Sequence, residues 1–274
     1  MKHFVFSLLL LVSGFPNSVF AQGDDDIRYI NGTFDGHHVD GKKEGLGKAI
    51  FKDGSSYNGE WKNDKRNGTG RQIFKDGSSY YGDWKDDRRE GSGTYEFANG
   101  DKFTGQFANN QINGYGTYKF ANGNKYVGEI SRGAITGKGI FYYKSGDRYE
   151  GEVQNGLKTG KGKYFFANGN IYEGNFTADR KEGVGKLLFS NGDVYAGDFV
   201  NNHRTGKGTF TWANGNVYEG AFANGLMNGA GVFTWPNGDK YVGVWDNNIR
   251  DGKGKLITHE GEEVAEVYDN GVKQ

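Results

Sequence analysis

The sequence contains no cysteine, only two prolines and no excess of either charge, and each shortage excludes a class of protein. Without cysteine, the chain has no disulfide framework, no thiolate nucleophile and no cysteine-ligated metal. Two prolines among 274 residues exclude collagen and polyproline architectures. The 34 basic and 34 acidic residues balance, which argues against nucleic acid as a partner, because binding to a polyanion requires a net basic surface.

Long apolar runs are also missing, except for one near the N-terminus. Lys2 and His3 precede a mainly apolar run over residues 4–12, which is shorter than the ~20 residues of a membrane helix. The segment closes with Val19-Phe20-Ala21. This pattern predicts a signal peptide over residues 1–21 that is cleaved after Ala21, with a buried N-terminal strand as the alternative. We therefore expect an exported protein, either periplasmic or secreted.

Glycine and aromatic residues are abundant: the chain has 48 glycines, and 15% of its residues are aromatic. A flexible glycine-rich linker lacks aromatic side chains to bury, so this composition excludes a disordered linker. It indicates short strands joined by many turns.

A period of 23 residues organises the chain. An aromatic residue recurs nine times at this spacing, from Tyr57 to Tyr241, without an insertion. If that residue is position 1 of a repeat, positions 3, 12, 14 and 21 are glycine in all nine repeats. After the predicted signal peptide (1–21), this period divides the chain into an N-terminal segment over 22–29, an atypical first repeat with a longer loop over 30–56, nine 23-residue repeats over 57–263 and a decayed half-repeat over 264–274.

Each repeat carries two stretches with the alternation of a β-strand, at positions 1–5 and 12–18. Asn-Gly or Asp-Gly joins most consecutive repeats, and these dipeptides favour hairpin turns. The alternation predicts that Trp84 lies opposite glycines on both neighbouring strands, Gly70 and Gly91, with a three-residue loop at Asp76–Ser78. We call the side of the sheet that carries the aromatic residues of positions 1, 5, 16 and 18 the ring face, and the opposite side the outer face.

The pattern Tyr80-x-Gly82-x-Trp84, followed by Gly91-x-Gly93, resembles the MORN (membrane occupation and recognition nexus) repeat. The resemblance covers about residues 27–268 and recurs in every repeat, which makes it specific. It implies an all-β fold, an elongated single-layer antiparallel meander of tandem 23-residue hairpins. It also implies a role as a scaffold, a dimerisation module or a membrane-apposition module.

Signatures of catalysis, metal binding and cofactor binding are missing from the sequence. The segment Gly156–Lys161 imitates a phosphate-binding loop, but three residues separate its glycines where four are needed. Those glycines belong to the repeat, and we expect Lys158 between them to lie in a solvated loop. We therefore predict no catalytic, metal-binding or cofactor-binding residues and no enzymatic activity.

One group of apolar residues interrupts the polar outer face, and it consists of Ile140, Tyr142, Phe165 and Leu188. Contiguous apolar patches seldom stay uncovered on monomers, so we predict that these residues bind a protein partner or a second copy. The alternative is that a loop or a terminal segment covers them, or that the twist of the sheet buries them. The ring face around Trp84 and Phe107 is the second candidate surface.

The function that these observations favour is a non-enzymatic repeat scaffold or protein-binding module in the cell envelope or exterior. Association with a phospholipid membrane surface is the alternative, which the neutral net charge weakens. An enzyme is the class with the least support in the sequence.

Overall fold

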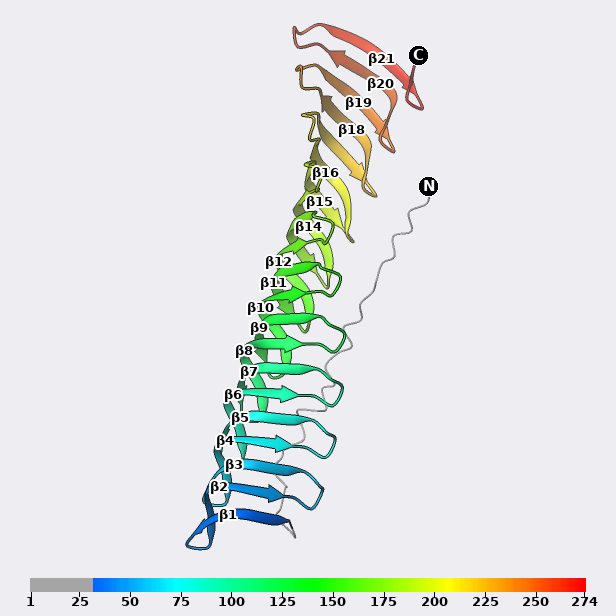
Figure 1. Cartoon of the computed structure of the whole chain (residues 1–274). Helices are drawn as coiled ribbons and strands as arrows, with labels where there is room; N and C mark the ends of the chain where they lie inside the picture. The colour runs from blue at the N-terminus through cyan, green and yellow to red at the C-terminus, as the bar shows by residue number, and fades with distance from the viewer. Residues whose placement is uncertain (1–31) are drawn as a thin grey trace. The chain divides into compact units, whose positions relative to one another are not determined.

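The computed structural model describes residues 32–274, and its regular elements within this range are all β-strands (Figure 1). The predicted signal peptide (1–21) and N-terminal segment (22–29) lie outside the described residues. The chain divides into two compact parts. The N-terminal part runs to Phe141 and includes Gln154–Gly156, and the C-terminal part comprises Tyr142–Val153 and Leu157–Gln274.

Within residues 32–274, twenty-two strands follow one another in sequence order. They are β1 (Thr33–Val39), β2 (Lys42–Ile50), β3 (Ser56–Lys62), β4 (Lys65–Ile73), β5 (Ser79–Lys85), β6 (Arg88–Glu96), β7 (Lys102–Ala108), β8 (Gln111–Lys119), β9 (Lys125–Ser131), β10 (Ala134–Tyr142), β11 (Arg148–Gln154), β12 (Leu157–Phe165), β13 (Ile171–Thr177), β14 (Arg180–Leu188), β15 (Val194–Val200), β16 (His203–Thr211), β17 (Val217–Ala223), β18 (Leu226–Thr234), β19 (Lys240–Asp246), β20 (Ile249–Ile257), β21 (Glu263–Asp269) and β22 (Val272–Lys273). Among the described residues there is no helix that is long and apolar enough to cross a membrane.

Within each part, every strand pairs antiparallel with the next strand in the chain, so the predicted meander of hairpin repeats is confirmed (Figure 1). The two strands of one repeat are joined by two residues, for example Asp86 and Asp87 between β5 and β6. Both have positive φ, 48° and 66°, which is the backbone of a tight hairpin turn that matches strand twist. Asp and Asn recur here because they tolerate this conformation better than other residues.

The predicted register is correct within a repeat as far as Tyr80 opposite Tyr95 and Gly82 opposite Gly93. Beyond these pairs a β-bulge shifts the strands, and Trp84 faces Arg89 instead of the predicted Gly91. Gly91 supplies the bulge because its φ of 65° lies in the left-handed region, which costs glycine little.

The predicted register between repeats is wrong by two residues. Trp84 lies opposite Gly68, and Gly70 lies opposite Gly82. The connection is five residues long, Phe74–Ser78, and is closed by hydrogen bonds from Phe74 N to Ser78 O (2.9 Å) and from Gly77 N to Phe74 O (3.0 Å). Phe74 therefore lies in a loop that folds onto the ring face, 5.7 Å from Tyr95.

The core is a layer of rings that lie flat on glycine backbone. In the C-terminal part, Tyr172 is fully buried and makes edge contacts with Phe176 (5.2 Å) and Phe199 (5.0 Å). Its hydroxyl donates to Asn175 O at 3.0 Å. A Cβ atom added to Gly174 would lie 2.5 Å from that hydroxyl, so the glycine spacing has a packing cause.

The N-terminal end of the described chain differs from the sequence prediction. The first hairpin has an ordinary two-residue turn, Asp40-Gly41, and pairs Phe34 with Ala49 and Gly36 with Gly47. Phe34 therefore occupies position 1, and the predicted longer loop in this repeat is wrong. At the C-terminus, β21 and β22 form a short last hairpin.

Candidate binding face

The bulge in each repeat places a long side chain at position 10 on the ring face. In β14, Lys181 lies opposite Phe176 because the register shifts between Gly174 and Asn175. This position was not recognised in the sequence, although a long side chain occupies it in every repeat. In the C-terminal part its residues are Lys158, Lys181, Arg204, Met227 and Arg250.

The cations at position 10 lie over aromatic rings. The Lys181 Nζ atom is 5.3 Å from the ring centre of Phe166 and 5.4 Å from that of Tyr172. The Arg204 guanidinium is 5.3 Å from the ring centre of Phe210 and 5.4 Å from that of Tyr195. Cations within about 6 Å of a ring centre are attracted to its face, so each side chain is held in place by the rings.

A second row of rings, at positions 16 and 18, continues the ring face. Phe210 and Trp212 are 4.6 Å apart, and each contacts the adjacent repeat, through Phe189 (5.7 Å) and Phe233 (5.3 Å). In the C-terminal part this row is half-exposed, and its members are Tyr143, Tyr164, Phe166, Phe189, Phe210, Trp212, Phe233 and Trp235. In the N-terminal part the corresponding Tyr95 and Tyr118 are buried. The C-terminal part therefore offers the more accessible aromatic surface.

Carboxylates and amides at position 22 fix the loops that carry these rings. The Asp147 carboxylate accepts hydrogen bonds from Ala167 N at 2.7 Å and from the Tyr164 hydroxyl at 3.0 Å. Burial and the Asp147 charge both raise the pKa of Tyr164, so the phenol stays a proton donor. Asn170, Asp193 and Asp239 accept the equivalent backbone N–H from the loop of the following repeat. In the C-terminal part, position 22 alternates between carboxylate and amide, as Asp147, Asn170, Asp193, Asn216 and Asp239. Asn216 cannot make this bond, because residue 236 is a proline and has no N–H.

Lys158 is not the solvated loop residue that the sequence predicted. It lies in β12, its side chain is only 13% exposed, and its Nζ atom is 2.7 Å from Asp179 Oδ1. The backbone N–H of Lys158 also donates to this carboxylate at 2.9 Å. The prediction failed because the hairpin turn is only two residues long, which leaves position 10 inside the strand.

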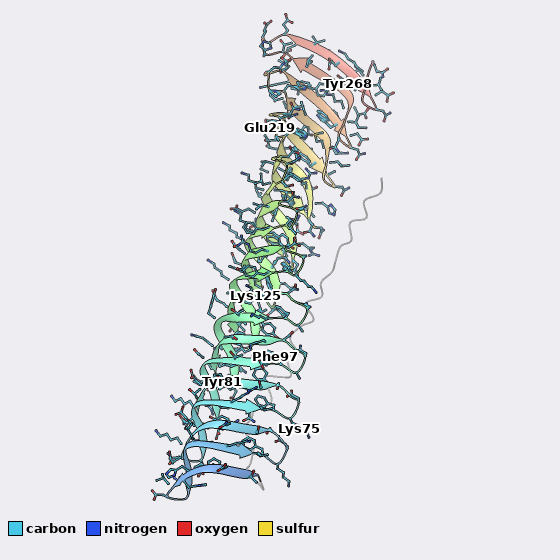
Figure 2. All side chains as sticks on the ribbon, viewed as in Figure 1. Lys75, Tyr81, Phe97, Lys125, Glu219 and Tyr268 are labelled. Atoms are coloured by element: carbon cyan, nitrogen blue, oxygen red, sulfur yellow. The ribbon has the colours of Figure 1, made fainter. Side chains whose placement is uncertain are left out.

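The ring face ends at a polar network in the last hairpin, which Tyr268 marks in Figure 2. Arg250 Nη1 donates to the Tyr268 hydroxyl at 2.9 Å, and this hydroxyl donates to Glu266 Oε2 at 3.0 Å. Lys273 Nζ donates to Glu266 Oε1 at 2.7 Å. An open depression of about 590 Å³ lies beside this network and is lined by Trp235, Pro236, Asn237, Asp239, Arg250, Leu256 and Glu266.

The terminal network predicts a pH-dependent contribution to stability. The hydrogen bond from Lys273, helped by Tyr268 and Arg250, holds the pKa of Glu266 below its ordinary value of 4.5. A depressed carboxyl pKa stabilises the fold above the unfolded-state pKa, and this contribution disappears as pH falls through the folded-state pKa. We expect Glu266→Gln to lower Tm by about 2–4 °C at pH 7 and by less at pH 3, as measured by circular dichroism. An equal difference at both pH values would contradict this assignment.

The residues that the sequence proposed as binding sites lie in different surroundings. Trp84 and Phe107 are each 3% exposed, so their rings belong to the core, and a partner on the ring face meets positions 16 and 18 instead. On the outer face, Phe165 lies opposite Ile171, Ile171 opposite Leu188, and Leu188 opposite Val194.

Phe165, Ile171, Leu188 and Val194 form an apolar row on the outer face of the C-terminal part. The sequence analysis had identified Phe165 and Leu188 but not Ile171 or Val194. The Arg148 guanidinium covers the Phe165 ring at 4.1 Å, and Leu188 is 38% exposed. Tyr142 belongs to the same part of the chain, whereas Ile140 belongs to the N-terminal part, where it is half-buried.

The family model of the MORN repeat matches ten consecutive segments of the chain. They are residues 34–56, 57–79, 80–102, 103–125, 126–148, 149–171, 172–194, 195–217, 218–240 and 241–261. The chain belongs to the MORN repeat family. The sequence-based assignment is thereby confirmed, and the first match begins at Phe34, in agreement with the register of β1 and β2. MORN repeats form repeat scaffolds and binding modules, and the family is generally not enzymatic.

Two of the solved structures that match the chain do so at low sequence identity. The TCP10 domain of Danio rerio CPAP in complex with a peptide of Danio rerio STIL is 10% identical, and the match covers 89% of this chain and 99% of that chain with a TM-score of 0.47. The SAS-4 (dCPAP) TCP domain of Drosophila melanogaster, in complex with a proline-rich motif of Ana2 (dSTIL), is 16% identical, and the match covers 65% and 90% of the two chains with a TM-score of 0.37. No curated protein matches the sequence. Within residues 32–274, no group of three or more His, Asp or Glu side chains is placed to hold a metal ion.

Proposed function

We propose that this MORN-repeat protein is a non-enzymatic scaffold that holds a protein partner on the ring face of its C-terminal part. The half-exposed row of rings beside the position-10 cations carries the proposal. Rings and cations of this kind dominate the energy of protein contacts, because they bury a large area and still offer polar groups. The sheet and the loop clamps hold them in place, so little ordering entropy opposes association.

The proposed location is the cell envelope or the exterior. The basic start, the apolar run over residues 4–12 and the small residue Ala21 support export with removal of residues 1–21. The mass of the mature protein tests this, because export with cleavage after Ala21 leaves Gln22 as the first residue.

Replacing rings on the ring face is expected to abolish capture of the partner. We expect Phe210→Ala combined with Trp212→Ala to weaken cross-linking to a native partner by about tenfold or more, since a desolvated ring contributes ~2 kcal/mol. Thr211→Ala is the matched control, because Thr211 lies between the two rings and on the opposite face. Retention of every cross-linked partner by the double variant would show that this face is not the interface.

A second candidate surface is the outer apolar row of Phe165, Ile171, Leu188 and Val194, together with the predicted Tyr142 of the same part. Its cross-strand contiguity supports self-association or a further partner. The same experiment includes Tyr142→Glu combined with Phe165→Lys, with mass measured by light scattering. Loss of a dimer in this variant alone assigns self-association to the outer face. Sedimentation of the protein with vesicles of anionic lipid would favour membrane association over protein binding through either surface.

A further inference from the structure

Some position-10 cations pair with a carboxylate of the next repeat, and two neighbouring ones in the C-terminal part, Lys181 and Arg204, have no carboxylate at that place. Arg66 pairs with Asp87 (3.1 Å) and Lys158 with Asp179 (2.7 Å), where the carboxylate comes from the turn of the next repeat. The residue in that turn is Asn202 for Lys181 and Gly225 for Arg204. Asn202 Oδ1 accepts the backbone N–H of Lys181 at 2.9 Å, and Gly225 O accepts from Arg204 Nη2 at 2.5 Å.

Lys181 and Arg204 are therefore adjacent cations whose charges have no carboxylate within ion-pair distance among residues 32–274. Both lie among rings, and burial lowers the pKa of each below its ordinary value. The positive charge of Arg204 lowers the pKa of Lys181 further. Burying a charge without a counter-charge costs free energy. An anionic group that binds beside Lys181 and Arg204 offsets this cost, so it binds more tightly than it would beside an exposed lysine.

The spacing of the two cations selects a conformation of the ligand. Lys181 is on β14 and Arg204 on β16, and strands two apart in a sheet are separated by about 9.6 Å. A polyproline II helix rises about 9.3 Å per turn of three residues, so side chains three apart lie on the same side at this spacing. In an extended strand, same-side side chains are about 6.6 Å or 13 Å apart and do not match.

The rings between the cations suit the same ligand. Phe189 lies 5.7 Å from Phe210, and Phe166 and Phe189 flank Lys181 and Arg204 at 5.3 Å and 5.8 Å. All three rings are half-exposed. Aromatic-lined surfaces bind proline-rich segments because a polyproline II helix is already ordered and presents flat apolar rings.

We propose that the ring face around Lys181 and Arg204 binds an acidic, proline-containing protein segment in the polyproline II conformation, with carboxylates three residues apart. One carboxylate pairs with Lys181 and the other with Arg204, while the intervening residues pack on Phe189 and Phe210. This site rests on the proposed function and defines the chemistry of its partner.

The probe is a fluorescent peptide of four Glu-Pro-Pro triplets, with Kd measured by fluorescence anisotropy on the full protein. We expect it to bind at least about tenfold more tightly than peptides of Lys-Pro-Pro or Glu-Gly-Gly triplets, which lack the charge or the stiffness. Lys181→Gln combined with Arg204→Gln should weaken binding by about tenfold or more. Lys186→Gln combined with Lys207→Gln removes two exposed cations of the outer face and should leave Kd unchanged.

Asn202→Asp separates a binding effect from misfolding. Asp is accepted in this turn, as Asp87 and Asp179 show at φ of 66° and 70°, and it supplies the missing internal carboxylate to Lys181. We expect this variant to have an equal or higher Tm and to bind the Glu-Pro-Pro peptide at least about fivefold more weakly, because the peptide carboxylate is displaced.

Several outcomes would overturn the proposal: equal affinity for the Glu-Pro-Pro and Glu-Gly-Gly peptides, unchanged binding by the Lys181/Arg204 double variant, or binding of anionic vesicles in place of the peptide. If the native partner is still lost on replacement of Phe210 and Trp212, a failure with the peptide refutes this site only. If the peptide binds and those replacements retain every native partner, the proposed function fails and the site stands.

Discussion

Gly151→Val is expected to destabilise the C-terminal part by about 3 kcal/mol or more, the upper range for overpacking a tightly packed site. A Cβ at Gly151 would lie 2.5 Å from the Tyr149 hydroxyl, 2.6 Å from Gly162 Cα and 2.7 Å from Lys161 O. Two of these neighbours are backbone atoms, which cannot move away without disrupting the sheet. The Tyr149 hydroxyl would also lose its hydrogen bond to Glu152 O, now 2.8 Å long.

Two further variants calibrate this result. Lys161→Val places the same side chain on the exposed outer face next to Gly162 and should change stability by no more than ~0.5 kcal/mol. Lys158→Ala should fall between the two, because it removes an ion pair and a stem packed on the rings of Tyr149 and Tyr164. Equal denaturation midpoints for Gly151→Val and Lys161→Val would refute the close packing of rings on glycine.

Asp179→Asn is expected to cost about 1–3 kcal/mol in the native protein and very little in a Lys158→Met background. The substitution leaves the Lys158 ammonium among the rings of Tyr143, Tyr149 and Tyr164 without its carboxylate. Asn keeps an oxygen for the backbone N–H of residue 158, so only the ion pair is tested.

One repeat of the natural chain already carries the residue pair of the double variant, Met at position 10 and Asn in the next turn. Three repeats closer to the C-terminus, at intervals of 23 residues, Met227 occupies position 10 of its repeat, and its backbone N–H donates a hydrogen bond to Asn248 Oδ1 at 2.8 Å. Lys158→Met alone should be nearly neutral for the same reason. A urea-denaturation cycle over the four proteins measures the coupling, and additive effects of the two substitutions would contradict a stabilising ion pair between these residues.

The period, the two strands per repeat and the ring-on-glycine packing could be predicted from the sequence because they follow from residue spacing. The bulge at Gly91 and the five-residue connection at Phe74–Ser78 could not. Alternation is preserved when a register shifts by two residues, so glycines at positions 12 and 14 satisfied the wrong pairing as well as the observed one.

The same ambiguity of register is the reason that the candidate binding face was not predicted from the sequence. In the predicted register, glycine lay opposite position 5 on both sides, and no side chain was expected beside the rings. The bulge brings Lys181 to that place. The available signal was position 10 itself, which holds Lys, Arg, Ile or Met in every repeat, never a small or acidic residue.

The clamps at position 22 have a consequence for how such a chain changes its length. In the C-terminal part each hairpin is bonded only to its sequence neighbours, and each clamp reaches only the next loop, so the fold behaves as a one-dimensional array with nearest-neighbour coupling. Deletion or duplication of one 23-residue repeat, such as 172–194, joins strands that occupy equivalent positions in their repeats. It would, however, bring two carboxylate clamps or two amide clamps next to each other, whereas a change of 46 residues would preserve their alternation. A two-repeat module is therefore the unit whose duplication or deletion keeps carboxylate and amide alternating at position 22 in this part.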